Sequence, residues 1–536
     1  MTTSGIPYRD TGYFSSLLTD YLEQNPKLEF TYGRFPTLDQ LKAQAQEKCA
    51  AFPEAHRQVL VEVLQEQYAT LDVAPEVAKN ISALRSKNAV TLTTGHQLCL
   101  LTGPLYFIYK ILTIIKLAEQ LRAQAPELEV VPVYWMATED HDFEEISSFQ
   151  FQQQKFQWTK AAEGPVGRMN LEGLAPVLEA FSKVLGKTLH AEKLLDSIAN
   201  SYGSASTLAE ATRCLVNGLF ASYGLVVIDA DHPKLKTLFR PQVHRELTEQ
   251  LTHTKVQEQV EKIKQDYNSS YKPQVAPRAL NLFYFYDGGR YRIEKEGDNY
   301  LLVGTSKVFS QQALLQELEV HPENFSPNVL LRPLYQEVIL PNIAYIGGGG
   351  ELAYWLELKS FFDASNVLFP ILLLRNAALV LTPKDEKKCK ALGVDPKQLF
   401  LSRTALLAQK TKALSELDIN LQFFKDTLEA QFKTLEAIAK KTDASFIGSV
   451  AAQRAKQFKG IDRLEQRLLR AEKRKFKAKL QRLSNLHERL FPKGNLQERV
   501  LNFSSFYCDY GPDFIAQLYR EFDPLGQDFT ILTTGE

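Results

Sequence analysis

Cysteine is scarce in this chain of 536 residues, and its placement indicates neither a disulfide framework nor a zinc site. The cysteines are five in number, which is odd, and they lie far apart with no CxxC pair: Cys49, Cys99, Cys214, Cys389 and Cys508. Disulfide-rich secreted domains and zinc sites need cysteines that are paired or closely spaced. The pattern excludes both classes and fits a protein of a reducing cytosol.

The chain also lacks a secretory signal and an uninterrupted apolar run that could span a membrane. Its first residues carry neither a positively charged segment nor an apolar one. The longest apolar run, residues 98–118, contains Pro104, Lys110 and Lys116 and directly follows a strand-like segment, which favours a buried crossover helix. We therefore expect a cytoplasmic protein without a membrane partner.

A net charge is absent as well. The 63 basic residues balance 63 acidic ones, so the whole molecule creates no field that would attract nucleic acid. A hydrophobic content of 44% with 24% charged residues is ordinary for a globular protein. Because 536 residues exceed what one compact core accommodates, we predict at least two domains, or one domain with large insertions.

Residues 90–146 predict a strand, a polar loop, a helix and a second strand. The first strand ends in Gly95-His96-Gln97, and the loop continues to Thr102-Gly103 just before Pro104, which suits the first turn of a helix. The free amides of such a helix start bind anions. Strand ends and helix starts meet at the carboxyl edge of an open parallel sheet, where ligands bind. These loop residues therefore predict a ligand site.

The second strand, residues 130–137, is almost wholly apolar and leads into the polar run Glu139-Asp140-His141-Asp142. Carboxylates so close together repel one another unless a cation, a metal or a substrate amine compensates them. Acids at a helix start also stabilise the helix dipole without any ligand. Both interpretations stand at this point.

The rest of the chain divides by its pattern. We predict an N-terminal helical layer of the core (1–88), the first half of a parallel-sheet core (89–148), a mostly helical insertion (149–277), a β-meander insertion (278–303), the second half of the core (304–382), an antiparallel coiled-coil arm (383–492) and a segment that returns to the core (493–536). Asp229, Asp231 and His232 follow a short apolar run inside the helical insertion. His232 before Pro233 also suits a turn.

Four glycines, Gly347 to Gly350, stand between a predicted strand and a predicted helix in the second half of the core. A run like this costs chain entropy. Either the backbone approaches a ligand and forms an anion-binding nest, or the turn packs tightly on the helix. It is not a Walker loop, because no lysine followed by serine or threonine comes at the required spacing. Arg332 and Arg375 lie beside presumed strand ends of the same region.

A heptad pattern marks the predicted arm, with leucines at positions 407, 414, 421, 428 and 435 and a break at Thr442-Asp443 before a second helix. Residues 384–490 hold 25 Lys and Arg against 13 Asp and Glu, a net charge of +12, so the remainder carries −12. A basic hairpin could contact nucleic acid. Charged flanking positions around a dimer interface are the commoner reason, and we favour a homodimer.

Together these motifs resemble the cysteine ligase family of bacillithiol biosynthesis. The similarity covers nearly the whole chain and keeps the motif order Thr94-Gly-His-Gln97, Leu101-Thr-Gly-Pro-Leu-Tyr106, Glu139-Asp-His-Asp142, Arg332-Pro-Leu-Tyr-Gln-Glu337, Gly347 to Trp355 and Tyr510-Gly-Pro-Asp-Phe514. The resemblance implies an α/β fold with a Rossmann-like parallel-sheet core related to class I nucleotidyl-activating enzymes. It also implies connecting-peptide insertions and a dimerising antiparallel α-helical coiled coil. One departure is His96, where the family commonly has glutamine; a lysine signature loop is also missing.

The resemblance further implies the final step of bacillithiol biosynthesis, an amide bond between the cysteine carboxyl group and the amine of glucosaminyl malate. On this reading we expect His96, Asp140, His141 and Asp142 to be catalytic. The expected substrate-binding residues are Gly95, Gln97, Thr102, Gly103, Arg332, Glu337, Gly347, Gly348, Gly349, Gly350, Glu351, Tyr354 and Trp355. Lys384, Phe503 and Tyr507 form a candidate second nucleotide site, because such aromatic rings can stack on adenine or simply pack in the core.

ATP or ADP is the candidate cofactor, and the sequence leaves the activation step open. No metal and no nucleic-acid partner is expected. Two other classes stay open: another ATP-dependent ligase or nucleotidyltransferase on the same core, and a non-catalytic assembly protein whose coiled coil is the working part.

Overall fold

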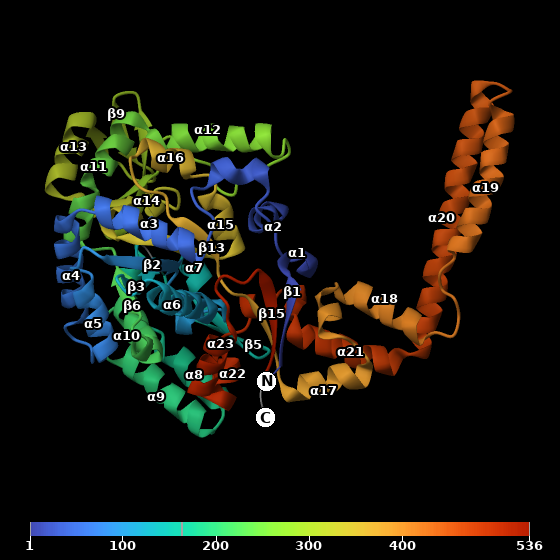
Figure 1. Ribbon diagram of the computed structural model, residues 1–536, viewed down its shortest axis with the longest axis horizontal. Coiled ribbons are helices and arrows are strands. Elements are labelled where there is room, and N and C mark those ends of the chain that lie inside the picture. The colour runs from blue at the N-terminus through green and yellow to red at the C-terminus, as the bar shows by residue number, and fades with distance from the viewer. Residues whose placement is uncertain (1, 162–163, 535–536) are drawn as a thin grey trace.

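The structure is a computed structural model that describes residues 2–161 and 164–534. Figure 1 shows a body that holds the central sheet and an arm that leaves it near the chain termini and ends in a long helical hairpin. The body contains the first 382 residues together with the C-terminal helices and strand.

Five parallel strands form the central sheet in the order β13-β12-β2-β3-β6. They are β2 (Ala89–His96), β3 (Glu129–Met136), β6 (Val226–Asp229), β12 (Asn342–Gly347) and β13 (Ile371–Leu374). Read from β6 by chain order, the arrangement is 3-2-1-4-5, the Rossmann order with its switch point between β2 and β12. The predicted Rossmann-like α/β fold class is confirmed.

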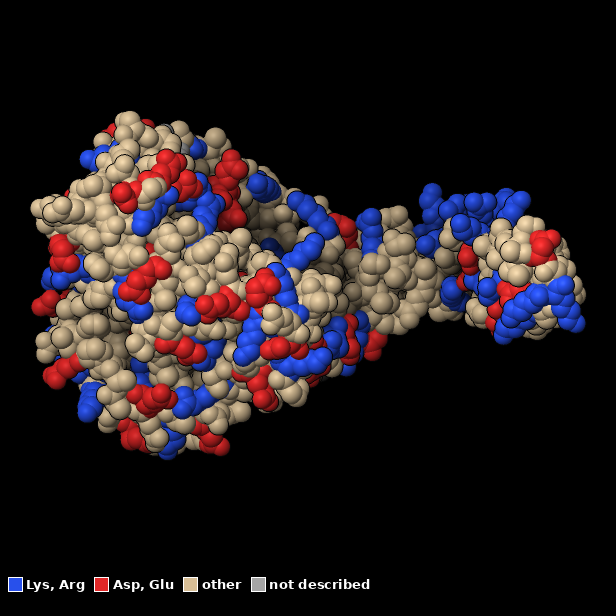
Figure 2. Space-filling model, turned by 90° about the horizontal axis from the view of Figure 1, so that it is seen from above, with Lys and Arg blue, Asp and Glu red and all other residues tan. Residues whose placement is uncertain are grey.

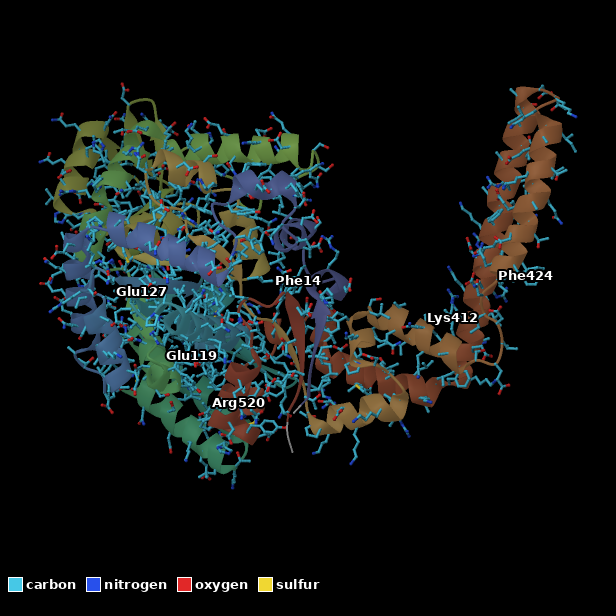
Figure 3. All side chains as sticks on the ribbon, in the orientation of Figure 1. Phe14, Glu119, Glu127, Lys412, Phe424 and Arg520 are labelled. Atoms are coloured by element: carbon cyan, nitrogen blue, oxygen red, sulfur yellow. The ribbon has the colours of Figure 1, made fainter. Side chains whose placement is uncertain are left out.

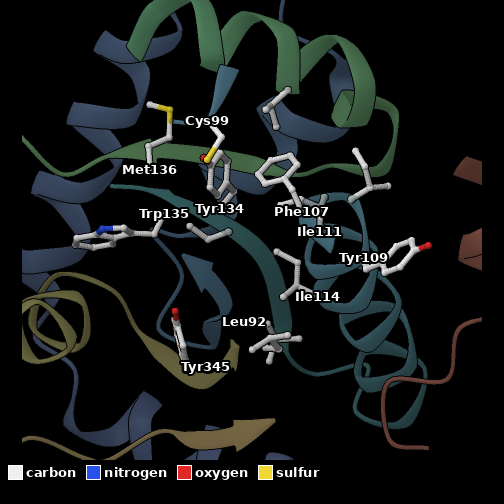
Figure 4. Packing of buried hydrophobic residues seen from close by; sticks show 14 of the residues in the cluster. Leu92, Cys99, Phe107, Tyr109, Ile111, Ile114, Tyr134, Trp135, Met136 and Tyr345 are labelled. Atoms are coloured by element: carbon white, nitrogen blue, oxygen red, sulfur yellow. The ribbon is translucent and has the colours of Figure 1, made fainter. Parts of the chain in front are cut away.

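Helices of the first half pack around this sheet. They are α1 (Tyr8–Thr11), α2 (Ser16–Leu22), α3 (Leu38–Ala51), α4 (Glu54–Tyr68), α5 (Pro75–Ala83), the crossover helix α6 (Tyr106–Gln124) and the short α7 (Phe143–Ile146). Figure 4 shows Phe107, Ile111 and Ile114 of α6 buried beside Leu92 of β2 and Tyr134 of β3. Among the described residues, no helix is both long and apolar enough to cross a membrane.

The segment 149–277, predicted as an insertion, differs from the structure in one respect. It holds β4 (Ser148–Phe151), β5 (Gln154–Gln157), α8 (Ala175–Leu185), α9 (Leu189–Gly203), α10 (Leu208–Phe220), α11 (Pro233–Glu249) and α12 (Leu251–Asp266). It also supplies β6, which pairs with β3 in the core sheet. A strand of four residues between helices carries too little pattern to reveal its partner, so the core is not confined to the two predicted halves.

The predicted β-meander is confirmed and extends further than expected. Strands β7 (Leu282–Tyr286), β8 (Gly289–Glu296) and β9 (Asn299–Leu302) pair antiparallel, and β10 (Val308–Ser310) and β11 (Phe325–Pro327) complete a five-stranded sheet. Helix α13 (Gln311–Val320) lies between the last two. After it come α14 (Arg332–Ile339), α15 (Gly349–Trp355) and α16 (Lys359–Ala364).

The two chain ends meet in a small sheet that the sequence did not indicate. Strand β1 (Thr2–Pro7) pairs antiparallel with β15 (Asp528–Thr533), which pairs parallel with β14 (Ala378–Leu381). The first 88 residues are therefore not purely helical. Because β1 pairs with a strand more than 500 positions away, local pattern cannot identify it. The C-terminal helices α22 (Ser504–Tyr510) and α23 (Pro512–Glu521) pack on the body.

The arm contains five helices: α17 (Pro383–Leu392), α18 (Arg403–Leu414), α19 (Gln422–Ala439), α20 (Ala444–Lys475) and α21 (Lys477–Leu490). The turn at Thr442-Asp443 is confirmed, since Asp443 caps α20. The predicted single helix from residue 407 is wrong: it breaks between α18 and α19, because α18 packs near α21 while α19 pairs with α20. Figure 2 shows Lys and Arg gathered over the arm, and Figure 3 marks Phe424 on α19.

Candidate functional site

A cavity of about 910 Å³ lies at the carboxyl edge of the central sheet. Its floor comes from the ends of β2, β3 and β6 and from α14 and α15. Its roof comes from β7, β8 and part of the loop 267–281. Since residues of both β2 and β12 line it, the cavity occupies the switch point of the sheet, where Rossmann-like folds bind ligands.

A buried ion pair joins β2, α6 and α15 in the floor. The Lys110 ammonium donates to the Gly95 carbonyl at 2.7 Å and lies 2.6 Å from Glu351 Oε2. Glu351 also accepts from the Tyr345 hydroxyl at 2.7 Å and the Gly348 amide at 2.8 Å. Burial raises the pKa of Glu351, but Lys110 and these donors outweigh it and hold the pKa below its ordinary value. The pair compensates its own charge and shapes the floor.

Arg332, the first residue of α14, has one guanidinium nitrogen that makes no hydrogen bond. Its guanidinium carbon lies 5.6 Å from the ring centroids of both Trp135 and Tyr345. Nη1 donates to Gln336 Oε1 at 3.0 Å, whereas Nη2 is buried without a partner. Because a guanidinium binds carboxylates in a bidentate geometry, this part of the wall suits an anionic ligand group.

His96 lines the cavity with an apolar surrounding and one unpartnered polar atom. Its side chain packs on the rings of Tyr106 and Phe107, with centroids 5.4 and 5.1 Å away. The residue is 8% exposed, and Nε2 is buried without a hydrogen-bond partner. Burial, with Lys110 as the next cause, lowers the pKa of His96 to about 3. The imidazole is therefore neutral near pH 7 and offers Nε2 to a ligand.

Two carboxylates share one amide at the other side of the cavity. Gln97 Nε2 donates to Asp140 Oδ2 at 2.8 Å and to Glu145 Oε2 at 2.7 Å. Asp140 Oδ1 accepts from the amides of residues 141 and 142. Among the described residues, neither carboxylate lies within 4 Å of a lysine or arginine nitrogen. This pair therefore keeps negative charge that a ligand cation can compensate.

His141 is contacted from the roof. Its Nδ1 lies 2.9 Å from Nη1 of Arg290, which comes from β8, and 3.8 Å from Asp140 Oδ1. Its ring lies 5.4 Å from that of Phe283 on β7. Burial, followed by Arg290, lowers the pKa of His141. The β-meander insertion therefore takes part in the site.

Six charged residues that line this cavity are not among the predicted site residues: Lys110, Glu139, Glu145, Arg278, Arg290 and Arg292. In the sequence Lys110 interrupts an apolar run, and a lysine amid buried helix positions is itself a signal of a functional or paired charge. Glu139 is buried and paired with Lys236 of α11. Arg290 follows the turn between two meander strands, and no local pattern connects it with residue 141.

Asp142 and Glu337, two of the predicted site residues, lie outside the cavity lining for identifiable reasons. Asp142 caps α7 by accepting from the Glu145 amide at 3.3 Å, so the helix-cap interpretation holds for this residue. Glu337 is buried behind the site, where it accepts from Lys48 at 3.3 Å and from Asn342 at the start of β12 at 2.6 Å. His232 caps α11.

The backbone of the loop before α6 forms hydrogen bonds with the C-terminal segment, at Leu501 and Asn502. Thr102 and Gly103 have φ angles of 69° and 68°, and neither lines the cavity. The Asn502 side chain donates to the Leu101 and Gly103 carbonyls at 2.8 and 2.6 Å. The amide of Leu105 donates to Leu501 at 2.7 Å.

Of the region 347–355, only Glu351 and Tyr354 reach the cavity. A Cβ on Gly347 would stand 2.7 Å from Leu352, and one on Gly349 would stand 2.8 Å from Leu18. Gly348 precedes α15 and Gly350 faces open space. Trp355 is fully buried and stacks on Tyr345 at 4.4 Å. Close helix packing explains the first and third glycines, and none of the four glycines lines the cavity.

Two of the three residues of the candidate second nucleotide site, Phe503 and Tyr507, contact each other directly. Phe503 is buried in the core, with Tyr507 in edge contact at 5.6 Å, whereas Lys384 lies on α17 of the arm. No hydrogen bond or ring contact of the described residues joins Lys384 to either ring. In the same described ranges, no group of three His, Cys, Asp or Glu side chains could hold a metal ion.

The 3-2-1-4-5 sheet with a charged cavity at its switch point defines a Rossmann-like ligand-binding protein, here with a helical arm. The chain belongs to the bacillithiol biosynthesis BshC family: residues 1–376 match its N-terminal Rossmann-like domain and residues 378–534 its C-terminal coiled-coil domain.

Relatives support this over the full length. A protein of Flavobacterium johnsoniae, named "Putative cysteine ligase BshC", is 47% identical over 99% of this chain and 100% of its own. A protein of Christiangramia forsetii with the same name is 46% identical over 100% of both chains. A solved structure from Campylobacter jejuni, named "putative arginyl t-RNA synthetase", is 12% identical over 81% of this chain and 100% of its own, with a TM-score of 0.19.

Proposed function

We propose that this protein is a cysteine ligase that completes bacillithiol biosynthesis by joining the cysteine carboxyl group to the amine of glucosaminyl malate. One observation carries the proposal: a single cavity holds the Asp140 and Glu145 carboxylates, which form no ion pair with a lysine or arginine of the described residues, and, separately, the Nη2 of Arg332, which is buried without a partner. These groups suit a substrate that has both an amine and carboxylates. The names of the relatives support the choice of cysteine as the second substrate.

In the proposed reaction the carboxylate pair holds the substrate ammonium and accepts one of its protons. The free amine nitrogen then attacks the carboxyl carbon of cysteine, the C–N bond forms and one C–O bond of that carboxyl group breaks. The oxygen leaves as water in the reaction without ATP, or together with a phosphoryl group if ATP is the co-reactant. Arg332 binds a malate carboxylate and so orients the sugar. His96, neutral and enclosed, offers a hydrogen bond to a substrate atom in the floor. Lys110 and Glu351 keep the β2 and α15 segments in place around it.

A nucleotide has no evident cradle in this cavity. Gly347 and Gly349 of the glycine run pack on Leu352 and Leu18, and Lys384 of the expected second nucleotide site lies on the arm helix α17. We therefore assign no step to ATP, and the reaction is to be measured with and without it.

The test is to supply the purified protein with cysteine and glucosaminyl malate, with or without ATP, and to detect the amide product by mass spectrometry. The double variant Asp140→Asn/Glu145→Gln should lose at least tenfold in rate, because it removes the charge that holds the ammonium. Asp142→Asn is the matched control, since asparagine also caps a helix and residue 142 lies outside the cavity. Wild-type rates in the double variant would contradict the site assignment.

We also propose a homodimer through the arm. Several apolar side chains of the hairpin α19–α20 are exposed, among them Phe424 at 58% and Ile438 at 51%. Within the hairpin, only Phe432, Ala439 and Val450 form a buried cluster. A second copy of the arm is the partner that these apolar positions suit.

A further inference from the structure

The roof of the cavity holds Arg290 in one fixed orientation. Its Nε donates to Ser326 Oγ at 3.0 Å and its Nη2 to the Pro327 carbonyl at 2.9 Å, both on β11. Its guanidinium also lies 4.0 Å from the ring centroid of Phe283 on the paired strand β7. Three strands of one sheet therefore determine where the remaining nitrogen, Nη1, points.

That remaining nitrogen points at His141 Nδ1, 2.9 Å away. A guanidinium can donate hydrogen bonds but cannot accept them. The Nδ1 atom must therefore offer a lone pair, and a neutral imidazole then carries its proton on Nε2. We propose that Arg290 is a positioning residue that holds His141 in the neutral Nε2–H tautomer, so that His141 presents a hydrogen-bond donor, and not a base, to the substrate.

The charges around His141 divide into two sets. Asp140 and Asp142, on the same loop, favour the protonated imidazolium, with Asp140 Oδ1 3.8 Å from Nδ1. Arg290, from the roof, opposes protonation and occupies the nitrogen that the proton would need. Phe283 adds an apolar ring at 5.4 Å. The lowered pKa of His141, caused by burial and then by Arg290, agrees with this balance.

This tautomer changes the roles in the cavity. A donor at Nε2 suits a substrate oxygen, such as a carboxylate or a carbonyl, and cannot take a proton from an ammonium group. Proton acceptance then falls to the Asp140 and Glu145 pair. The identity of the substrate rests on the proposed function, whereas the tautomer does not.

The tautomer can be measured on the full-length protein without substrate. Histidines are labelled with ¹⁵N, and the His141 signals are identified by their loss in His141→Asn. We expect a non-protonated Nδ1 and a protonated Nε2 at neutral pH. A protonated Nδ1 in the wild-type protein would overturn the proposal, and no variant is needed for this result.

Variants then test the role of Arg290. In Arg290→Gln the pKa of His141 should rise, and the Nδ1–H tautomer should become populated. Arg290→Lys should shift the pKa less, because the charge remains. Arg240→Gln, which removes a surface guanidinium paired with Glu319, should leave both unchanged. Identical His141 titrations in wild type and Arg290→Gln would contradict the assignment.

Activity supplies a separate readout. The side-chain amide of glutamine places an N–H donor near the position of Nε2, so His141→Gln should keep ligation within about tenfold of wild type, whereas His141→Leu should lose more. Equal losses in the two variants would indicate a base. If wild type makes no amide at all, the proposed function fails, and the nitrogen signals still decide the tautomer.

Discussion

Arg332 and Glu337 lie on the same helix, α14, and have opposite environments. Arg332 faces the cavity with Nη2 unpartnered, whereas Glu337 is enclosed by Lys48, Gln336 and Asn342. A group with an unused donor can be changed at small cost to the fold, but a group that completes a buried network cannot. Substitution of Arg332 should therefore affect mainly ligand binding, and substitution of Glu337 should affect mainly the stability of the fold.

Arg332→Gln is predicted to weaken binding of glucosaminyl malate by about 1.5–3 kcal/mol, or roughly 10- to 150-fold, because a charge-assisted hydrogen bond to a carboxylate is lost. Isothermal titration calorimetry measures the dissociation constant. The loss of stability should be smaller than that in Glu337→Gln, since Arg332 belongs to no buried ion pair among the described residues and glutamine can still donate to Gln336. Unchanged affinity would remove Arg332 from the binding site.

Glu337→Gln is predicted to do the reverse. It leaves the Lys48 ammonium buried without its carboxylate, and breaking a buried ion pair costs about 3–5 kcal/mol. Urea unfolding should show this loss, while the affinity for glucosaminyl malate stays as in wild type. A loss of affinity equal to that of Arg332→Gln would show that Glu337 belongs to the binding site after all.

At the scale of elements, the loop 267–281 forms part of the roof and depends on one buried carboxyl group. Glu357 Oε1 accepts from the Tyr271 hydroxyl at 2.5 Å and from the Gln274 amide at 2.9 Å, and Oε2 is buried without a partner. Gln274 lines the cavity. The protonation state of Glu357 therefore acts on the roof of the site.

Burial raises the pKa of Glu357 from 4.5 to about 7. Since the folded state holds this proton more tightly than the unfolded chain, the resulting stability is complete below pH 4.5 and is lost as the pH rises through 7. The contribution is on the order of 3 kcal/mol. Glu357→Gln should remove this dependence, because glutamine accepts the same two hydrogen bonds without a charge.

Denaturant unfolding at pH 5 and pH 8 measures the effect. The loss of stability between these pH values should be smaller in Glu357→Gln than in wild type. Glu261→Gln, an exposed position on α12, should behave as wild type does. If wild type and Glu357→Gln lose stability in parallel, the carboxyl group does not titrate in this window.

Elements with a strong local pattern could be predicted, and those that depend on distant partners could not. The apolar runs of β2 and β3 were enough to predict the parallel central sheet, and the turns between β7, β8 and β9 were enough to predict the β-meander insertion. The pairing of β1 with β15 and the place of β6 depend on contacts far along the chain. The candidate site follows the same rule: His96, Asp140 and Arg332 stand at strand or helix ends, whereas Arg290 reaches residue 141 only through the fold of the meander.

At the scale of the whole molecule, the arm differs from the body in its net charge and in the apolar side chains that it exposes. Residues 384–490 carry +12 against −12 elsewhere, and Figure 2 shows the basic side chains spread over the arm. Helix α19 exposes Phe424, Leu435 and Ile438, which the 3.6-residue period places on one side. A monomer would leave these side chains in water, so a second arm is expected to cover them.

Phe424→Lys/Ile438→Lys is therefore predicted to convert a dimer into a monomer, because two charges would be desolvated at the interface. Size-exclusion chromatography with light scattering measures the mass. Helicity should be retained, since the hairpin's own cluster around Phe432 and Val450 is untouched. Ala430→Lys, at an exposed position about 120° around α19 from Phe424, adds the same kind of charge and should leave the dimer intact. A monomeric wild-type protein, or a double variant that stays dimeric, would place the interface outside this side of the arm.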